Sequence, residues 1–194
     1  MFFIPEIKIQ RTLFNSLVRC RLEYCCQVWD PSTKTQIDKI EQIQRSFTSK
    51  IEFMDNYNYW ERLEKLSIMS LQRRREKLAI IFIWKIKNNL VPNVINLEFS
   101  KTTRRSGTTA TVKPMPSVKG RLLSNYENSF TIKAAKLWNK LPPNLREVTE
   151  LRPFCNELKK FLSLFPDLPP IRGYFHIDNN SILDYKHITG LTSA

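Results

Sequence analysis

The sequence predicts a mainly α-helical protein, with antiparallel helical hairpins and a small helical bundle, an irregular basic linker that could form a short β-hairpin, and a C-terminal helical pair. Apolar residues recur at three- and four-residue intervals along most of the chain, which is the spacing of helices that bury one face. Asp30-Pro31 and Pro142-Pro143 interrupt that spacing, as short connections between helices do. With 194 residues, of which 42% are hydrophobic, the chain can bury one moderate core or two small ones.

Two helices are expected to form an antiparallel pair at the start of the chain. The first covers residues 7–29, where Ile9, Leu13 and further apolar residues keep mostly three- to five-residue spacing. The second covers 33–51, where apolar residues recur at three and four. Because the connection through Asp30-Pro31 is short, the two helices should run in opposite directions.

Two further helices are expected before residue 90. Asn58 and Glu61 have the spacing of a capping box, which predicts a short helix over 59–66. A longer helix is predicted over 71–89 by the spacing of its apolar residues. It is apolar nearly all round between Leu78 and Trp84, so it should have neighbours on more than one side.

The composition changes between Ser100 and Tyr126, where Thr, Ser, Gly and Pro are frequent and no acidic residue occurs. This texture predicts a linker, or a loose hairpin through Thr109–Val112 and Arg121–Ser124. The basic residues of the stretch are Lys101, Arg104, Arg105, Lys113, Lys119 and Arg121.

Helical spacing returns over 129–141, in a helix that the following Pro-Pro pair should end. A last helix is expected to begin at Thr149 or near Pro153, with Phe154 and further large apolar residues inward. Beyond Phe165, proline and mixed polar residues predict a poorly ordered tail.

These elements divide the chain into a helical bundle over 1–98, a basic linker or loose hairpin over 99–126, a C-terminal helical segment over 127–165 and the tail over 166–194. The four cysteines show neither a disulfide framework nor the paired spacing of zinc ligands. The longest apolar run is far shorter than the roughly 20 residues of a membrane span. We therefore expect an intracellular protein of the nucleus or cytoplasm with no membrane partner.

The charge balance favours a polyanionic partner. Lysine and arginine number 31 against 18 acidic residues, which gives a formal net charge of +13 and a pI near 9.8. Such a balance is typical of proteins that bind RNA or DNA. A basic organellar or scaffold protein is the alternative.

Catalytic chemistry finds little support in the sequence. Two-metal nucleotidyl transfer needs clustered carboxylates, whereas the six aspartates include no adjacent pair and no aromatic-Ala-Asp-Asp turn. His176 and His187 are far in sequence from every cysteine, so we expect no metal site. No glycine-rich phosphate loop occurs either. We therefore expect no enzymatic activity, no cofactor and no small-molecule substrate for this chain.

Two basic clusters are the candidate nucleic-acid contacts. Arginines and a lysine follow one another at the start of the helix predicted over 71–89, where they could straddle a phosphate backbone. The alternative is a solvated helix face that Glu76 partly neutralises. The acid-free stretch could be a basic arm that orders on RNA or DNA, or a plain interdomain linker. The candidate contacts are Arg73, Arg74, Arg75, Lys77, Arg104, Arg105, Lys119 and Arg121.

A series of short motifs, taken in order, resembles the region that follows the palm in reverse transcriptases of jockey-like and chicken-repeat-like non-LTR retrotransposons. The resemblance covers about residues 7–162, and the ordered set is more specific than any single motif. The motifs are Ser16-Leu17-Val18-Arg19, Leu22-Glu23-Tyr24, Val28-Trp29-Asp30-Pro31, Ile40-Glu41-Gln42-Ile43-Gln44-Arg45, Tyr59-Trp60-Glu61-Arg62-Leu63, Leu66, Ser70-Leu71 with Arg73-Arg74, Ser129-Phe130, Ala134-Ala135-Lys136-Leu137-Trp138-Asn139, Leu141-Pro142 and a closing helix over Phe154 to Phe161.

The resemblance implies that 1–98 is a thumb-like helical bundle followed by a post-polymerase region. The family's catalytic aspartates lie upstream of the first matching residue, so the Mg of the parent RNA-directed DNA polymerase would be held by a palm domain missing from this chain. RNA and DNA, as template and primer, and that palm domain are the implied partners. Two alternatives are a helical protein-interaction module and a truncated element product without function.

Overall fold

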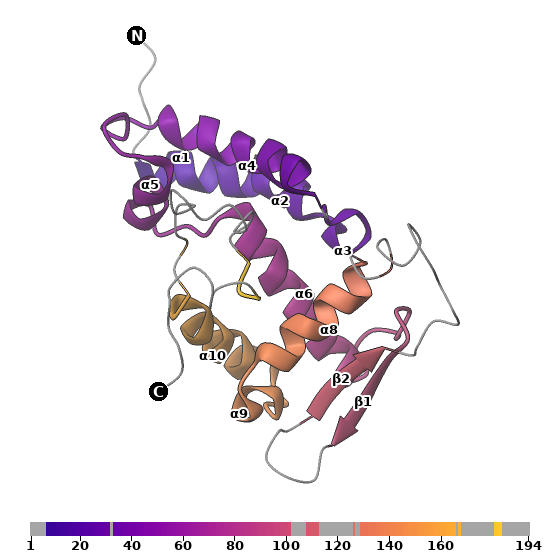
Figure 1. The fold of residues 1–194 in the computed structure, drawn as a ribbon. Coiled ribbons are helices and arrows are strands. Elements are labelled where there is room, and N and C mark those ends of the chain that lie inside the picture. Colours follow the sequence, from indigo (N-terminus) through magenta and orange to yellow (C-terminus); the bar gives the residue numbers. More distant parts are fainter. Residues whose placement is uncertain are drawn as a thin grey trace, which may run out of the picture. The chain divides into compact units, whose positions relative to one another are not determined.

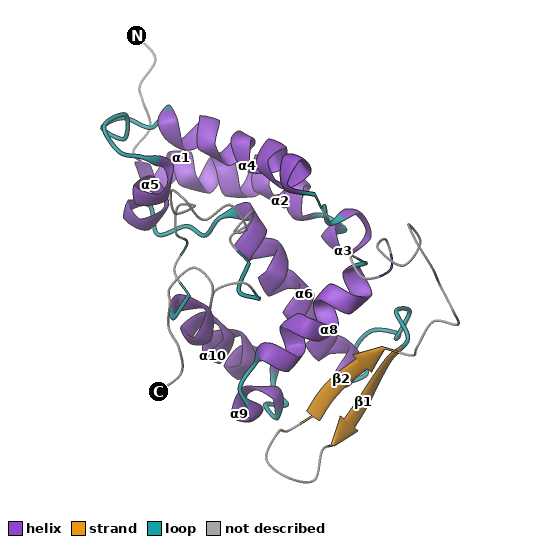
Figure 2. Ribbon diagram, viewed as in Figure 1, coloured by secondary structure: helices purple, strands orange, loops and turns teal. Residues whose placement is uncertain are grey.

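A computed structural model shows a mainly α-helical protein with one two-stranded antiparallel sheet, which confirms the predicted fold class (Figures 1 and 2). Among the residues that it describes, no helix combines the length and the apolar character needed to cross a membrane. The described residues are 7–31, 33–101, 108–112, 126, 129–165, 167 and 181–183.

The described residues separate into two compact units. The first unit contains 7–75 and Asp167, and the second contains 76–165 and 181–183. The boundary lies inside helix α6 (Leu71–Lys87) and not at residue 98, where the sequence suggested it. The reason is that the first turn of α6 contacts acidic side chains of the first unit, whereas Ile80, Ile83 and Trp84 further along are buried among apolar residues.

The first unit begins with a helical stretch that runs without interruption from Ile7 to Glu23. It comprises α1 (Ile7–Leu13), the π-helical segment η1 (Phe14–Arg19) and α2 (Cys20–Glu23). The single helix predicted over 7–29 is wrong in one respect, because Cys25 adopts a left-handed conformation with φ 49°. This residue ends the long stretch and starts the short helix α3 (Cys26–Trp29).

Helix α4 (Lys34–Ser49) returns alongside this stretch in the opposite direction, as predicted (Figure 1). The rings of Phe14 and Phe47 stack between the two, with centroids 4.2 Å apart. The chain then continues into α5 (Tyr59–Lys65), whose capping box is confirmed. The Asn58 side chain accepts hydrogen bonds from the backbone of Trp60 and Glu61, and the Glu61 carboxylate accepts one from the Asn58 backbone at 2.9 Å.

The core of the second unit is a cluster of large rings. It is formed by α6, α8 (Phe130–Lys140) and α10 (Leu151–Ser163). Phe154 lies 5.4 Å from the ring of Trp84 and 6.3 Å from that of Trp138, and all three side chains are buried. The Pro-Pro pair ends α8 as predicted, but its second proline also begins the short helix α9 (Pro143–Arg146), since proline suits the first position of a helix.

Strands β1 (Leu97–Lys101) and β2 (Thr108–Val112) pair in antiparallel register, with Leu97 opposite Val112 and Phe99 opposite Ala110. The predicted hairpin chose the wrong partner for 109–112, because the pairing is with 97–101; 121–124 lie outside the described residues. Leu97 and Ala110 are buried, and Phe99 meets the Trp138 ring edge-on at 6.4 Å. Burial of one face of the sheet therefore fixes the register.

An amide side chain attaches the sheet to α8. Asn139 donates to the carbonyl oxygen of Ala110 at 2.8 Å and accepts from its N–H at 2.9 Å, as a further strand would.

Beyond Phe165, residues 181–183 differ from the poorly ordered tail that the sequence predicts. Ile182 is fully buried and its N–H donates to Glu76 at 3.2 Å, within the second unit.

Candidate nucleic-acid interface

The first turn of α6 contains Arg73, Arg74 and Arg75, which were predicted from the sequence to be phosphate contacts. Arg73 is buried, with 1% of its side chain exposed, and its Nε lies 3.9 Å from a carboxylate oxygen of Asp167. The same carboxylate accepts hydrogen bonds from the N–H and the hydroxyl of Ser70 at 2.9 and 2.7 Å. Ser70 in turn caps the helix, because its oxygen accepts from the Arg73 N–H at 3.1 Å.

Arg74 forms a bidentate ion pair with Glu23. Its Nε and Nη2 each donate to a different oxygen of Glu23, both at 2.7 Å. Arg19 pairs with the same carboxylate at 3.4 Å. Burial, and to a smaller extent repulsion from Arg74, lowers the pKa of Arg19, while the attraction of Glu23 raises it. Bidentate geometry of this kind joins α6 firmly to the helical stretch that ends at Glu23.

Arg75 is the third buried cation of the turn. Its Nε donates to Asp30 at 3.0 Å, and only 3% of the arginine side chain and 7% of the aspartate side chain are exposed. The guanidinium also lies 6.0 Å from the centre of the Trp29 ring. The Asp-Pro pair that follows α3 therefore supplies the counter-charge for this arginine.

Glu41 of α4 occupies the N-terminus of α6. Its carboxylate accepts hydrogen bonds from the N–H groups of Leu71 and Gln72 at 3.0 and 3.3 Å, and from the hydroxyl of Tyr59. Burial raises the pKa of Glu41, while the Tyr59 and Leu71 hydrogen bonds act in the opposite direction. The anion-binding end of α6 is thus filled by a side chain of the same unit.

These contacts correct the predicted role of Arg73 and Arg75, which are enclosed in ion pairs and do not reach a surface. The alternative of a solvated face is equally wrong for them and for the buried Glu76. Lys77 is half-buried and has contacts of its own. The remaining candidates, Arg104, Arg105, Lys119 and Arg121, lie outside the described residues.

A different basic surface lies on α8. Lys133, Lys136 and Lys140 follow one another at three and four residues, so they share one side of the helix, and we call them the α8 lysine stripe. Lys136 is exposed and the other two are half-buried. Residues 129–146 contain no acidic residue, while Glu127 and Glu147 flank this stretch, and Lys133 has a contact of its own. The buried side of α8 is formed by Ala134, Ala135, Leu137 and Trp138.

The stripe has the dimensions to face several phosphates. Seven residues separate its ends, which corresponds to roughly 10 Å along a helix. Duplex nucleic acid carries about one charge per 1.7 Å of its axis, so three ammonium groups over this length can neutralise phosphates without reading bases. Sequence reasoning missed the stripe, although its spacing within an acid-free stretch was visible.

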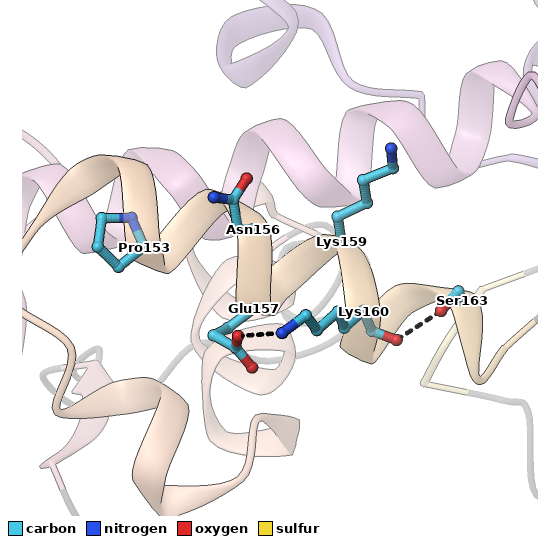
Figure 3. Close-up of a pocket in the computed structure, with 6 residues that line it drawn as sticks. All are labelled: Pro153, Asn156, Glu157, Lys159, Lys160 and Ser163. Atoms are coloured by element: carbon cyan, nitrogen blue, oxygen red, sulfur yellow. Dashed lines mark hydrogen bonds and ion pairs between the residues drawn. The ribbon is translucent and has the colours of Figure 1, made fainter.

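A depression of about 650 Å³ runs along α10 (Figure 3). Every residue that lines it belongs to that one helix, so it is an open surface rather than an enclosed site. The Lys160 ammonium donates to Glu157 at 2.7 Å, while Lys159 points away from this pair (Figure 3). The lining residues are Pro153, Asn156, Glu157, Lys159, Lys160 and Ser163.

Within the described part of the chain, no three or more His, Cys, Asp or Glu side chains gather closely enough to hold a metal ion. Cys20, Cys25, Cys26 and Cys155 are free thiols. Comparison with protein-family models, with curated proteins and with solved structures finds no match for this chain.

Proposed function

We propose that these residues correspond to the thumb and post-polymerase region of a non-LTR retrotransposon reverse transcriptase, and that they bind template and primer through the phosphate backbone. The ordered motif resemblance and the net charge of +13 support the proposal. The observation that carries it is the α8 lysine stripe, a row of cations in a stretch without acidic residues.

The two units contribute differently to this function. The first unit is a scaffold, in which Arg74 and Arg75 join the start of α6 to Glu23 and Asp30. The second unit presents the cationic surface. In the proposal neither unit carries out nucleotidyl transfer, and the carboxylates that bind Mg belong to a palm domain that partners this region. The partners are RNA and DNA, in the nucleus or cytoplasm.

Salt titration of binding tests the proposal. The probe is a labelled RNA–DNA hybrid of about 20 base pairs, and the stripe variant combines Lys133→Gln, Lys136→Gln and Lys140→Gln. A control combines Lys39→Gln, Lys50→Gln and Lys159→Gln, which removes the same charge from exposed positions outside the stripe. Each lost phosphate contact should reduce the slope of log affinity against log salt by about 1, so the stripe variant should lose about 2 to 3.

The control variant should retain most of the wild-type slope, because long-range charge is largely screened at physiological salt. Equal weakening of both variants would show that binding follows net charge and not the stripe. Binding of the wild-type chain that does not depend on salt would contradict backbone recognition altogether.

A further inference from the structure

One face of the helical stretch from Ile7 to Glu23 is exposed and uncharged. Ile9, Leu13 and Leu17 are 48%, 48% and 61% exposed, and they recur every four residues along it. Monomeric proteins seldom leave a contiguous row of large aliphatic side chains in water. Three short side chains lie on the same face, and all three are exposed: Thr12, Ser16 and Cys20.

The short side chains are already satisfied by their own helix. The Thr12 hydroxyl donates to the backbone carbonyl of Lys8 at 2.8 Å, and the Ser16 hydroxyl donates to that of Thr12 at 2.9 Å. The Cys20 thiol donates to the backbone carbonyl of Ser16 at 2.6 Å. If a partner covers this face, these three side chains keep their hydrogen bonds and no donor among them is left unsatisfied. Their small size allows a partner backbone to approach closely. The Ile9–Leu13–Leu17 row with these residues forms what we call the open face.

The π-helical segment keeps the open face in line. In an α-helix, residues four apart advance beyond one full turn, so a row at this spacing drifts round the axis. The wider turn of η1 (Phe14–Arg19) reduces that drift between Leu13 and Leu17. The face extends for roughly 16 Å from Ile9 to Cys20, which suits one helix lying along it.

The opposite side of the stretch holds it in the first unit. Phe14 stacks on Phe47 at 4.2 Å, and Arg11 donates to the carbonyl of Leu66 at 2.9 Å. Glu23, the sole acidic residue of the stretch, is bound by Arg19 and Arg74. The open face is consequently presented by a fixed helix and has no acidic side chain of its own.

The charges at its two ends select the partner. Lys8 precedes the open face and Arg21 follows it, and both are exposed. A second copy of this chain would place cation against cation in either orientation, which is unfavourable. We propose that the open face binds an amphipathic helix of a partner protein whose apolar stripe is flanked by acidic residues and lies along the open face. This binding is separate from that of the α8 lysine stripe.

The test uses a designed helical peptide of roughly 15 residues with a leucine stripe flanked by glutamates, and a second peptide with lysine at the flanks. The full chain should bind the acidic peptide and not the basic one. Leu13→Asn with Leu17→Asn should weaken that binding roughly tenfold or more. The matched control, Val94→Asn with Leu164→Asn, changes two side chains that are 70% and 69% exposed elsewhere and should not weaken it.

A charge reversal identifies the role of the ends. Lys8→Glu with Arg21→Glu should exchange the preference, so that the basic peptide binds better than the acidic one. Circular dichroism of each variant checks that the helices are retained. Equal binding of both peptides by the wild-type chain would overturn the proposal, as would affinity that is unchanged in the Leu13/Leu17 variant.

Two further results would assign the open face to other occupants and would also overturn the proposal. One is a dimer in sedimentation equilibrium that the Leu13/Leu17 variant abolishes. The other is tighter binding to phosphatidylserine-containing vesicles than to the acidic peptide, with the same sensitivity to that variant.

Discussion

The start of α6 and the outer side of α8 are both helical segments with three basic residues, yet the structure uses them in opposite ways. Arg73 and Arg75 are buried and Arg74 is half-buried, and each faces a carboxylate. On α8, by contrast, Lys136 is exposed in a stretch without acids. The comparison teaches that cations adjacent in the sequence can be consumed by ion pairs within the fold, so a basic cluster is not by itself a surface for phosphate.

The largest effect is expected where the buried cation loses its counter-charge. Asp30→Asn should lower the free energy of unfolding by about 3 kcal/mol, because it leaves the Arg75 guanidinium buried beside a neutral amide. Urea denaturation followed by circular dichroism measures the change.

The control for this substitution is an exposed pair. Glu157→Gln breaks the contact with Lys160, whose side chain is 74% exposed, and should change stability by less than about 0.5 kcal/mol. Equal effects of the two substitutions would mean that Arg75 is not held as the structure shows.

A smaller loss is expected from the clamp that holds α8 against the sheet. Asn139→Ala removes two hydrogen bonds to the backbone of Ala110 and should cost about 1 to 2 kcal/mol. Thermal or urea unfolding measures this loss. Asn144→Ala is a suitable control because Asn144 is an exposed residue of α9. A stability equal to that of the wild type would contradict the pairing of Asn139 with β2.

The capture of the α6 N-terminus by Glu41 predicts a pH dependence. Because burial raises the pKa of Glu41 above its ordinary value of 4.5, the folded chain binds this proton more tightly than the unfolded chain. The resulting stabilisation is complete below about pH 4.5 and is lost as the pH rises through the folded pKa.

Glu41→Gln removes this titration. The wild type should therefore lose unfolding free energy relative to Glu41→Gln as the pH rises from about 4.5. Urea unfolding at several pH values measures the difference. A constant difference, or one that shifts in favour of the wild type, would contradict the raised pKa.

Local signals in the sequence identified much of the fold. The capping box at Asn58 and Glu61 and the spacing of Ala134, Leu137 and Trp138 involve residues a few positions apart, so they could be recognised directly. The pairing of β2 with β1 could not, because strand partners depend on tertiary packing. The left-handed Cys25 was missed for the related reason that a cysteine carries no turn preference.

The candidate interface shows the same division between local and distant information. Arg74 and Arg75 are neutralised by acids 51 and 45 positions earlier in the chain, and Ser70 is bound by Asp167 97 positions later. No spacing rule within α6 could indicate these partners. The spacing of the α8 lysine stripe needed local information alone, since three lysines at three- and four-residue intervals are readable from the sequence.

The salt dependence of RNA–DNA hybrid binding by two single variants tests the central claim most directly. We expect Lys136→Gln to reduce the slope of log affinity against log salt by about 1 while stability is retained. We expect Arg74→Gln to lower stability and leave the slope unchanged, since its guanidinium is paired with Glu23. The reverse pattern, with the slope reduced by Arg74→Gln and unaffected by Lys136→Gln, would contradict this assignment of the binding surface.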